Sequence, residues 1–468
     1  MALVLAYLGE QPWLNFKESG LCHINFLFDR FAAEKNKTAV VLRGISVSYG
    51  ALLKKVFDQI EWLVRENIQQ GEAIILRGDY SPLAISMLLA LIERRCIIIP
   101  LTPDAFNSLR VSFGDVSPSW VIDVTGNAPT LQPLKTSNIP SLYQVIRERN
   151  VPGLVLFTSG SSGKPKAVVH DFSKLLEKFH LVRPSMTTLN FLLFDHWGGL
   201  NTLLHCLSNR CLIVVPESRT PDHICGLIEK FKIELLPITP SFLNMLLISK
   251  AYIGRNLDAL KLITYGAEPM SESTLKGARK IFPNVEFRQT YGMIELGVMR
   301  TKSRSPDSLW VKLGGEGYST RVVDGLLQIR ADAAMLGYLN ADSPFTDDGY
   351  LITGDLVETD GEWIRILGRQ SDIINVGGQK VYPAEVETIL LECPGVADVL
   401  VYGESNPILG KVVCADLILE SNVEESVVRQ AIRLLCKEKM QAYMSPVKIK
   451  FVQEIAQTGR LKRARTKI

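Results

Sequence analysis

The run LFTSGSSGKPKAVVH, Leu156–His170, changes abruptly from apolar to polar. The apolar residues Gly153–Phe157 predict a strand. The turn after it consists of hydroxyl-bearing residues, glycine and lysine around one proline: Thr158, Ser159, Gly160, Ser161, Ser162, Gly163, Lys164, Pro165 and Lys166. Glycine lets backbone N–H groups approach an anion, hydroxyls donate to phosphate oxygens, and lysine supplies positive charge. The run therefore predicts a loop that binds the phosphates of a nucleotide.

The spacing of this loop is not that of a Walker loop, which has more residues between its glycines and a Ser or Thr directly after its lysine. A flexible Ser/Gly connector is the alternative, but connectors seldom lie between an apolar strand and a run such as AVV with paired lysines. The loop resembles the phosphate loop of the adenylate-forming superfamily. That superfamily contains acyl-CoA synthetases, adenylation domains of peptide synthetases and firefly-type luciferases.

Composition places the chain among globular enzymes of two or more domains. The chain has 468 residues and a net charge of +3, with 52 Lys and Arg against 49 Asp and Glu, so nothing points to nucleic acid as a partner. Eight scattered cysteines without a CxxC pair favour reduced thiols over a disulfide framework or a zinc site. The longest apolar run, Pro82–Ile92, is too short to span a membrane, and the first residues lack a basic lead-in. We therefore expect a cytoplasmic protein without a membrane span.

The pattern along the chain predicts an α/β fold. Between about residues 25 and 260, short apolar runs such as AIIL (73–76) and CLIVVP (211–216) alternate with helical patterns such as that around 82–93, which favours parallel sheets covered by helices. Short strands rich in Gly and Asp near 315–370 predict a barrel-like section. Two helical patterns, the first with Pro383 at its start, and three strand patterns follow and predict a small α+β domain. We expect a large N-terminal domain, 1–368, that binds ATP and the acid, and a small mobile C-terminal domain, 369–468.

Two further motifs close strands with a glycine turn: YGAEP, Tyr265–Pro269, and QTYGMIELG, Gln289–Gly297. An aromatic residue at a strand end can stack on a purine, and a glycine turn can contact its edge. A lone carboxylate beside a phosphate loop is costly unless it holds a cation, so Glu295 is a candidate magnesium ligand, with Thr158 beside it. The resemblance implies nucleotide contacts from Gly266, Ala267, Glu268, Pro269, Tyr291, Gly292 and Met293.

Ile294 departs from the family pattern, because it replaces a threonine that contacts the α-phosphate. The motif GYLITGDLVE resembles the family's ribose-binding motif and assigns that role to Asp355, whose carboxylate can accept from both ribose hydroxyls. In the following GRQSD, the resemblance implies that Arg369 also reaches the nucleotide and that Ser371 is the hinge of the small domain.

The last motif matches imperfectly. In the family, a lysine after Thr-Gly serves the adenylation step, and here Arg460 holds that register after Thr458 and Gly459. Arginine keeps the charge, but its head is a broad planar fork rather than a compact ammonium. We expect Arg460 to act in catalysis with Lys166 and Glu295, and a solvated basic terminus is the alternative.

The acid pocket is predicted from FDHWGGLNTLL, which resembles the corresponding segment of acyl- and aryl-CoA ligases. The resemblance makes His196 and Trp197 pocket walls, and Ile294 and Val298 contribute an apolar floor with Met293. An apolar carboxylate, aryl or fatty, is the favoured substrate. Asp195 could instead hold the ammonium of an amino acid, as in peptide-synthetase domains.

The resemblance implies a ligase reaction in two steps. ATP and magnesium convert the carboxylic acid to an acyl-adenylate, and the thiol of coenzyme A or of a carrier-protein pantetheine then takes the acyl group. Two alternatives stay open. One is an enzyme that adenylates an amino acid and loads a carrier protein. The other is a degenerate member that binds nucleotide or acyl-adenylate with little turnover, for which Ile294, Ser371 and Arg460 are the evidence.

Overall fold

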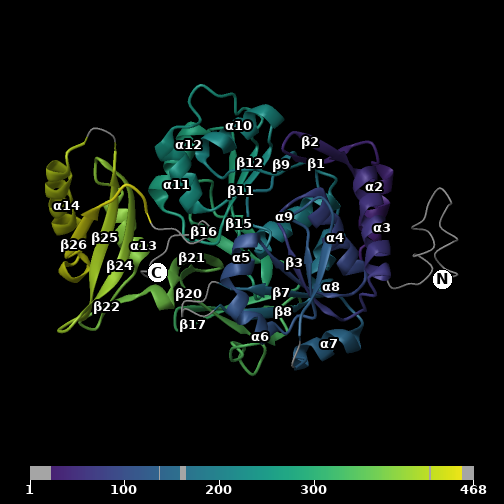
Figure 1. Ribbon diagram of the computed structural model, residues 1–468. Helices are drawn as coiled ribbons and strands as arrows, with labels where there is room; N and C mark the ends of the chain where they lie inside the picture. Colours follow the sequence, from purple (N-terminus) through teal and green to yellow (C-terminus); the bar gives the residue numbers. More distant parts are fainter. Residues whose placement is uncertain (1–22, 136–137, 159–164, 421–422, 456–468) are drawn as a thin grey trace. The chain divides into compact units, whose positions relative to one another are not determined.

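The computed structural model describes residues 23–135, 138–158, 165–420 and 423–455 (Figure 1). These residues form two compact units. Unit 1 contains the described residues up to Glu217 together with Ile294–Gly297 and Asp332–Ser343. Unit 2 contains Ser218–Met293, Val298–Ala331 and the described residues from Pro344 onward. No helix among the described residues is long and apolar enough to cross a membrane.

The main sheet of unit 1 has the order β19-β8-β7-β4-β3-β5-β6. Its strands are β3 (Ala73–Arg77), β4 (Ile97–Leu101), β5 (Trp120–Asp123), β6 (Thr130–Pro133), β7 (Gly153–Phe157), β8 (Ala167–Asp171) and β19 (Gly337–Tyr338). The strands β3, β4, β5 and β7 are parallel, as the apolar runs predicted. Every residue of β4 is buried, which is typical of a parallel strand with both faces covered.

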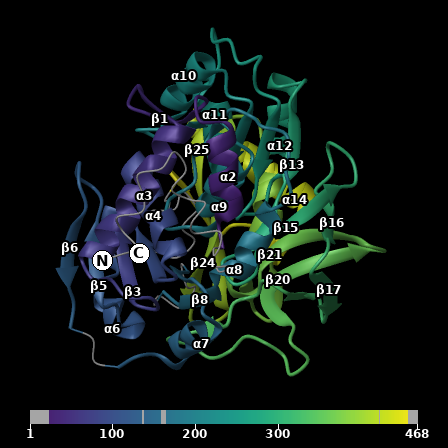
Figure 2. The same cartoon turned by 90° about the vertical axis from the view of Figure 1, so that its right-hand side faces the viewer.

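The described residues of unit 1 also form helices, some of which pack directly on strands of this sheet. They are α2 (Asn25–Ala33), α3 (Tyr49–Arg65), α4 (Pro82–Glu93), α5 (Pro103–Ser108), α6 (Phe113–Val116), α7 (Ser141–Arg149), α8 (Phe172–Leu176) and α9 (Trp197–Ser208), with 3₁₀ turns at Arg110–Ser112 and Glu177–Phe179. The nine residues Ala84–Ile92 of α4 are all buried, and α3 runs beside it (Figures 1 and 2). Unit 1 also contains β1 (Thr38–Leu42), β2 (Ile45–Ser48), β9 (Thr188–Leu189) and β10 (Ile213–Val214).

Unit 2 contains a parallel group and an antiparallel sheet. The strands β11 (Leu235–Ile238), β12 (Leu262–Tyr265) and β13 (Glu286–Gln289) are parallel and alternate with α10 (Pro221–Phe231), α11 (Pro240–Ser249) and α12 (Glu272–Ile281). The antiparallel sheet contains β14 (Tyr291–Met293), β15 (Gly297–Ser303), β16 (Trp310–Gly314), β17 (Tyr318–Val323), β18 (Leu326–Ala331), β20 (Leu351–Asp360) and β21 (Trp363–Arg369). The antiparallel sheet confirms the predicted change of architecture, but it begins about 20 residues before residue 315, with β14 and β15.

The C-terminal part of unit 2 has its own sheet and core. After a 3₁₀ turn at Gln370–Asp372 come β22 (Ile374–Val376), β23 (Gln379–Val381), α13 (Pro383–Leu390), β24 (Val396–Asn406), β25 (Gly410–Leu419), α14 (Glu425–Lys439), a second 3₁₀ turn (Ala442–Met444) and β26 (Lys448–Phe451). Val386, Leu390, Val399, Val413 and Ile432 are buried in one cluster. This part is the small α+β arrangement that the sequence predicted.

Candidate active site

The base of the predicted phosphate loop is a closed hairpin in unit 1. The strands β7 and β8 pair antiparallel, and the N–H of Thr158 donates to the carbonyl of Lys166 at 2.9 Å. Asn340 fixes the backbone where β8 begins. Its Nδ2 donates to the carbonyl of Pro165 at 3.0 Å, and its Oδ1 accepts from the N–H of Ala167 at 2.9 Å. The ends of the loop are therefore fixed by the sheet and by one asparagine.

Unit 1 brings two predicted catalytic residues to the same tyrosine. The hydroxyl of Tyr338 donates to Oε1 of Glu295 at 2.8 Å, and Nζ of Lys166 lies 4.9 Å from the centroid of the Tyr338 ring. Glu295 is 8% exposed, and its carbonyl accepts from the N–H of Met335 at 2.8 Å. A carboxylate and an ammonium are thus positioned together beside the hairpin.

A buried histidine positions the segment before Glu295. Nε2 of His170 lies 2.6 Å from the carbonyl oxygen of Ile294. Burial lowers the pKa of His170 to about 4, so the ring is neutral near pH 7 and donates from Nε2. His170 and Tyr338 were not predicted as site residues. His170 ends the quoted run, but only the fold places it against Ile294.

The predicted pocket motif forms the start of α9. His196 is the N-cap, and its Nδ1 accepts from the N–H of Gly198 at 3.1 Å. A Cβ atom at Gly199 would lie 2.0 Å from the carbonyl oxygen of Leu193 and 2.4 Å from the hydroxyl of Tyr80, so only glycine fits there. The His-Trp-Gly-Gly motif therefore has a structural reason for its last residue, and His196 itself stays half-buried.

Trp197 is 2% exposed and packs inside unit 1. Its ring meets Phe172 of α8 edge to face, with centroids 6.5 Å apart, and Nζ of Lys178 lies 5.5 Å from its centroid. Burial, and then the charge of Arg183, lower the pKa of Lys178 to about 7. Of the two predicted pocket walls, His196 is half-buried, whereas Trp197 is buried among side chains of unit 1.

Asp195, the candidate ligand for a substrate ammonium, is also buried. Its Oδ2 accepts from the Thr102 hydroxyl at 3.4 Å, and the residue is 5% exposed. Thr102 directly follows β4, so the carboxylate faces the end of that strand.

In unit 2, Asp355 contacts two other residues that are predicted to bind the nucleotide. The hydroxyl of Tyr291 donates to its Oδ2 at 2.6 Å, and Nε of Arg369 lies 2.8 Å from its Oδ1. Asp355 and Arg369 are direct partners in the register of β20 and β21. Burial and the charge of Asp355 both raise the pKa of Tyr291, which keeps its proton on the bond. The Asp355 N–H donates to the Thr353 hydroxyl at 3.0 Å, which fixes the backbone of β20 beside the carboxylate.

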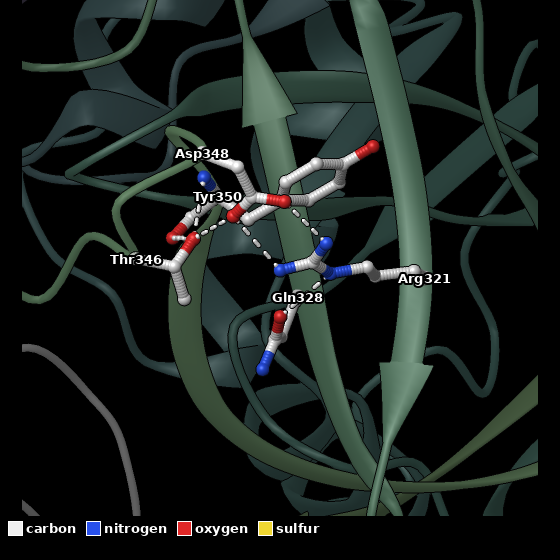
Figure 3. Close-up of polar contacts among 5 residues, drawn as sticks. All are labelled: Arg321, Gln328, Thr346, Asp348 and Tyr350. Carbon is white, nitrogen blue, oxygen red and sulfur yellow. Dashed lines mark hydrogen bonds and ion pairs between the residues drawn. The ribbon is translucent and has the colours of Figure 1, made fainter.

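The turn that leads into β20 is held by a second cluster (Figure 3). Arg321 of β17 binds both carboxylate oxygens of Asp348, at 2.5 and 3.0 Å. The guanidinium also lies 4.0 Å from the centroid of the Tyr350 ring and donates to Gln328 at 2.8 Å. Thr346 adds a bond to the same carboxylate at 2.5 Å. The segment just before Asp355 is therefore tied to the β17–β18 hairpin, a contact that no sequence motif signalled.

The YGAEP turn of unit 2 is equally constrained. A Cβ at Gly266 would lie 2.5 Å from the Thr290 hydroxyl and 2.6 Å from the Thr290 carbonyl oxygen. Ala267 has φ +71°, in the left-handed region. Oε2 of Glu268 accepts from the hydroxyl and the N–H of Ser241, at 2.6 and 3.3 Å, in the first turn of α11. The turn is thus anchored on both sides.

The remaining predicted site residues lie in or next to these motifs in the sequence. Gly292, Met293 and Val298 are half-buried, Pro269 is exposed, and Ile294 is 8% exposed. Ser371, the predicted hinge, is exposed within the 3₁₀ turn Gln370–Asp372, and its hydroxyl donates to Asp372 at 3.1 Å.

Two predictions lie outside the described residues. They concern the loop residues Ser159, Gly160, Ser161, Ser162, Gly163 and Lys164, and the catalytic candidate Arg460. Within the described ranges, no group of three or more His, Cys, Asp or Glu residues could hold a metal ion. Glu295 and Thr158 of unit 1 supply a carboxylate and a hydroxyl oxygen, which suits Mg²⁺ that keeps several waters and phosphate oxygens as ligands.

Comparison with known proteins gives these sites a common context. The family model of AMP-binding enzymes matches residues 27–339, and the model of the AMP-binding enzyme C-terminal domain matches residues 385–462. The 2-succinylbenzoate–CoA ligase of Listeria monocytogenes serotype 4b (strain F2365) is 24% identical over 476 residues, which cover 95% of this chain and 98% of that protein. The indoleacetate–CoA ligase of Aromatoleum aromaticum is 27% identical over 92% of this chain and 94% of its own length.

Solved structures agree on the fold. An anthranilate–CoA ligase in complex with anthranoyl-AMP superposes with a TM-score of 0.80 at 20% identity, covering 94% of this chain and 95% of that one. The ATP-bound MatB of Rhodopseudomonas palustris gives a TM-score of 0.75 at 20% identity, with 93% and 96% covered. Since the first family model matches well over half of the chain, this protein belongs to the family of AMP-binding enzymes.

Proposed function

We propose that this AMP-binding enzyme is an ATP-dependent acid–thiol ligase that activates an apolar acid, first of all an aryl acid, and transfers it to coenzyme A. The observation that carries the proposal is the contact of Lys166 and Glu295 with the same Tyr338 ring and hydroxyl, at the base of the phosphate-loop hairpin. An ammonium there offsets phosphate charge, and a carboxylate there holds a cation.

In the first step, a carboxylate oxygen of the acid attacks the α-phosphorus of ATP. The bond from the α-phosphorus to the bridging oxygen breaks, and pyrophosphate leaves. Lys166, with Arg460 and the hydroxyls of the loop, stabilises the charge that develops on the phosphoryl oxygens. Glu295 and Thr158 would hold magnesium, which when bound neutralises phosphate charge.

Asp355 would bind the ribose, because a carboxylate can accept from both ribose hydroxyls. The Tyr291 hydroxyl and the Arg369 guanidinium hold this carboxylate in place from two sides, at Oδ2 and Oδ1. The main-chain groups of the YGAEP turn and of Gly292 and Met293 would contact the adenine edge.

In the second step, the thiol of coenzyme A attacks the acyl carbon and AMP leaves. A pantetheine arm of a carrier protein is the alternative acceptor. We place the boundary of the mobile C-terminal domain at 368/369 and its hinge at Ser371, which lies in an exposed 3₁₀ turn between two sheets. The described cysteines are buried and not disulfide-bonded, which suits the cytoplasm.

The relatives support an aryl substrate, because their names give succinylbenzoate and indoleacetate as the acids activated. Within unit 1, His196 and Ile294 would line the acid site, with the buried Trp197 that follows His196 in the chain as a rigid support. Val298 belongs to unit 2 and stays a predicted residue of the acid site. The position of Asp195 favours an apolar acid over an amino acid as the substrate. Its carboxylate is buried and accepts a hydrogen bond from Thr102, instead of lying open to a substrate ammonium.

ATP–pyrophosphate exchange with aryl, fatty and amino acids tests the substrate class. We expect aryl acids to give the fastest exchange and to yield an acyl-CoA product when coenzyme A is added. Exchange with amino acids alone would favour the carrier-loading alternative. Nucleotide binding without exchange for any acid would establish the degenerate alternative.

A further inference from the structure

Two cysteines occupy the two positions of the turn after α9 that are joined by a backbone hydrogen bond across the end of the helix. The N–H of Cys211 donates to the carbonyl of Cys206 at 2.9 Å, and the N–H of Arg210 donates to that of Leu207 at 3.3 Å. Arg210 has φ +54°. These features define a Schellman motif, in which a side-chain contact joins the first acceptor residue to the last donor residue. Here those residues are Cys206 and Cys211.

Other helix ends of unit 1 and unit 2 use the same motif with ordinary apolar pairs. The corresponding backbone bonds, between 3.0 and 3.4 Å, join Leu63 with Ile68, Leu91 with Cys96, Ile146 with Val151, and Ile228 with Ile233. Among these motifs, the end of α9 alone has sulfur at both positions. Cys96 holds the donor position at the end of α4, but its partner is leucine.

The environment makes the two thiols unequal. The Cys206 thiol hydrogen-bonds to the Cys211 sulfur and lowers the pKa of Cys211, and the Met186 N–H adds a bond to that sulfur at 3.5 Å. Ser185 and the charge of Lys37 act in the same direction. Burial and the same thiol contact raise the pKa of Cys206. Cys211 is therefore the thiol that ionises first, with Cys206 in contact with it.

The pair is buried, and one of its contacts comes from a segment without regular secondary structure. Both cysteines have no exposed surface, and Met186, whose N–H donates to the Cys211 sulfur, belongs to the irregular segment 182–187. Ser185 in this segment is exposed, and its hydroxyl donates to the carbonyl of Arg210 at 3.0 Å and accepts from Nζ of the exposed Lys37 at 3.1 Å. Opening of this segment alone would admit a small oxidant to the sulfur, without unfolding the sheet.

We propose that Cys206 and Cys211 form a reversible dithiol–disulfide site that a small peroxide closes. The Cys211 thiolate attacks the distal oxygen of the peroxide, the O–O bond breaks, and the alcohol or water leaves after it takes up a proton. Cys211 becomes a sulfenic acid, oxidised by two electrons. The Cys206 sulfur then attacks the Cys211 sulfur, the S–O bond breaks, and the departing hydroxide leaves as water with the proton of Cys206. This site is independent of the proposed ligase reaction.

Peptide mapping of the full-length protein tests the proposal, because trypsin cuts after Arg210 between the two cysteines. The protein is treated with hydrogen peroxide, alkylated under denaturing conditions and digested. We expect the peptides 179–210 and 211–219, which contain one cysteine each, to appear joined and lighter than their sum by two hydrogens. The thiols that can be alkylated should fall by two from the total of eight, and a dithiol reductant should restore them.

The variants distinguish the roles of the two sulfurs. Cys206→Ser should leave a sulfenic acid on Cys211 that a cyclic diketone traps, whereas Cys211→Ser should leave Cys206 reduced. Cys96 is the matched internal control and should stay alkylatable in the wild type. If peroxide treatment leaves the two peptides unjoined, whether or not Cys96 or another thiol is oxidised, the proposal is wrong. It is also wrong if the two serine variants trap equal amounts of sulfenic acid.

Discussion

At the scale of single residues, the candidate site depends on buried groups that hold other groups in place. Asp355 is fixed by Tyr291 and Arg369, and Ile294 is fixed by His170. The sequence predicted Tyr291 as an aromatic contact of the nucleotide. The structure adds that its hydroxyl donates to the Asp355 carboxylate, because the register of β20 and the position of β14 bring the two together, and no local pattern encodes that.

Tyr291→Phe tests this positioning role. Loss of the hydroxyl removes a hydrogen bond to a charged group, worth about 1.5–3 kcal/mol, so we expect KM for ATP to rise by about tenfold or more with the acid KM nearly unchanged. Steady-state exchange kinetics measure both values. Tyr143→Phe is the matched control: it removes a 2.7 Å bond to the carbonyl of Val116 in unit 1 and should lower stability only. An unchanged KM for ATP in the Tyr291 variant would exclude the role.

His170 predicts a pH dependence of stability. Its pKa is about 4 in the folded protein against 6.5 ordinarily, so the unfolded chain binds the additional proton between these values. The stability is fully present above pH 6.5 and is lost as the pH falls toward 4, by about 3 kcal/mol. His170→Gln should remove this part of the slope in urea denaturation.

The control for that slope is His205, whose pKa burial also lowers to about 4. His205→Gln should flatten the profile similarly but leave pyrophosphate exchange intact, whereas His170→Gln should slow exchange because Ile294 and Glu295 lose their support. Identical exchange rates for the two variants would show that His170 does not position the segment.

At the scale of elements, the strongly patterned segments were predictable. The run AIIL became β3, Pro82–Glu93 became α4, and Pro383 begins α13, because burial on both faces, helical spacing and an N-terminal proline are local signals. The run CLIVVP was predicted as a strand, but the strand in the structure, β10, contains only Ile213–Val214. Its length is set by the residues that pair with β1 and β9. Contacts such as Arg321 with Asp348 were not predictable, because the partners are distant in sequence and exposed.

The start of α9 gives the sharpest test at this scale. Gly199→Ala places a Cβ against the carbonyl of Leu193, and a backbone atom cannot rotate away. We expect a loss of about 3 kcal/mol in the free energy of unfolding. Gly277→Ala in α12 is the matched control, because its Cβ would meet Leu247 Cδ1 at 3.4 Å, an ordinary contact, and should raise stability by about 0.5–1 kcal/mol. Equal effects of the two substitutions would contradict the packing described.

At the scale of the whole molecule, the predicted residues divide between the two units. Thr158, Lys166 and Glu295 belong to unit 1, whereas Tyr291 and Asp355 belong to unit 2. The order of the motifs along the chain sufficed to predict the superfamily, and the full-length relatives agree with it. The acid was not predictable to the same depth, because its pocket depends on side-chain shape, and Trp197, one of the two predicted walls, is buried against Phe172.

The central claim is that a carboxylate oxygen of the acid becomes bonded to the α-phosphorus of ATP. An aryl acid labelled with ¹⁸O in both carboxylate oxygens tests it, with ATP, magnesium and coenzyme A present. The mechanism predicts one ¹⁸O in the AMP released, none in the pyrophosphate, and one ¹⁸O in the acyl-CoA, as read by mass spectrometry. Label in inorganic phosphate together with ADP, or unlabelled AMP beside acyl-CoA product, would contradict the account.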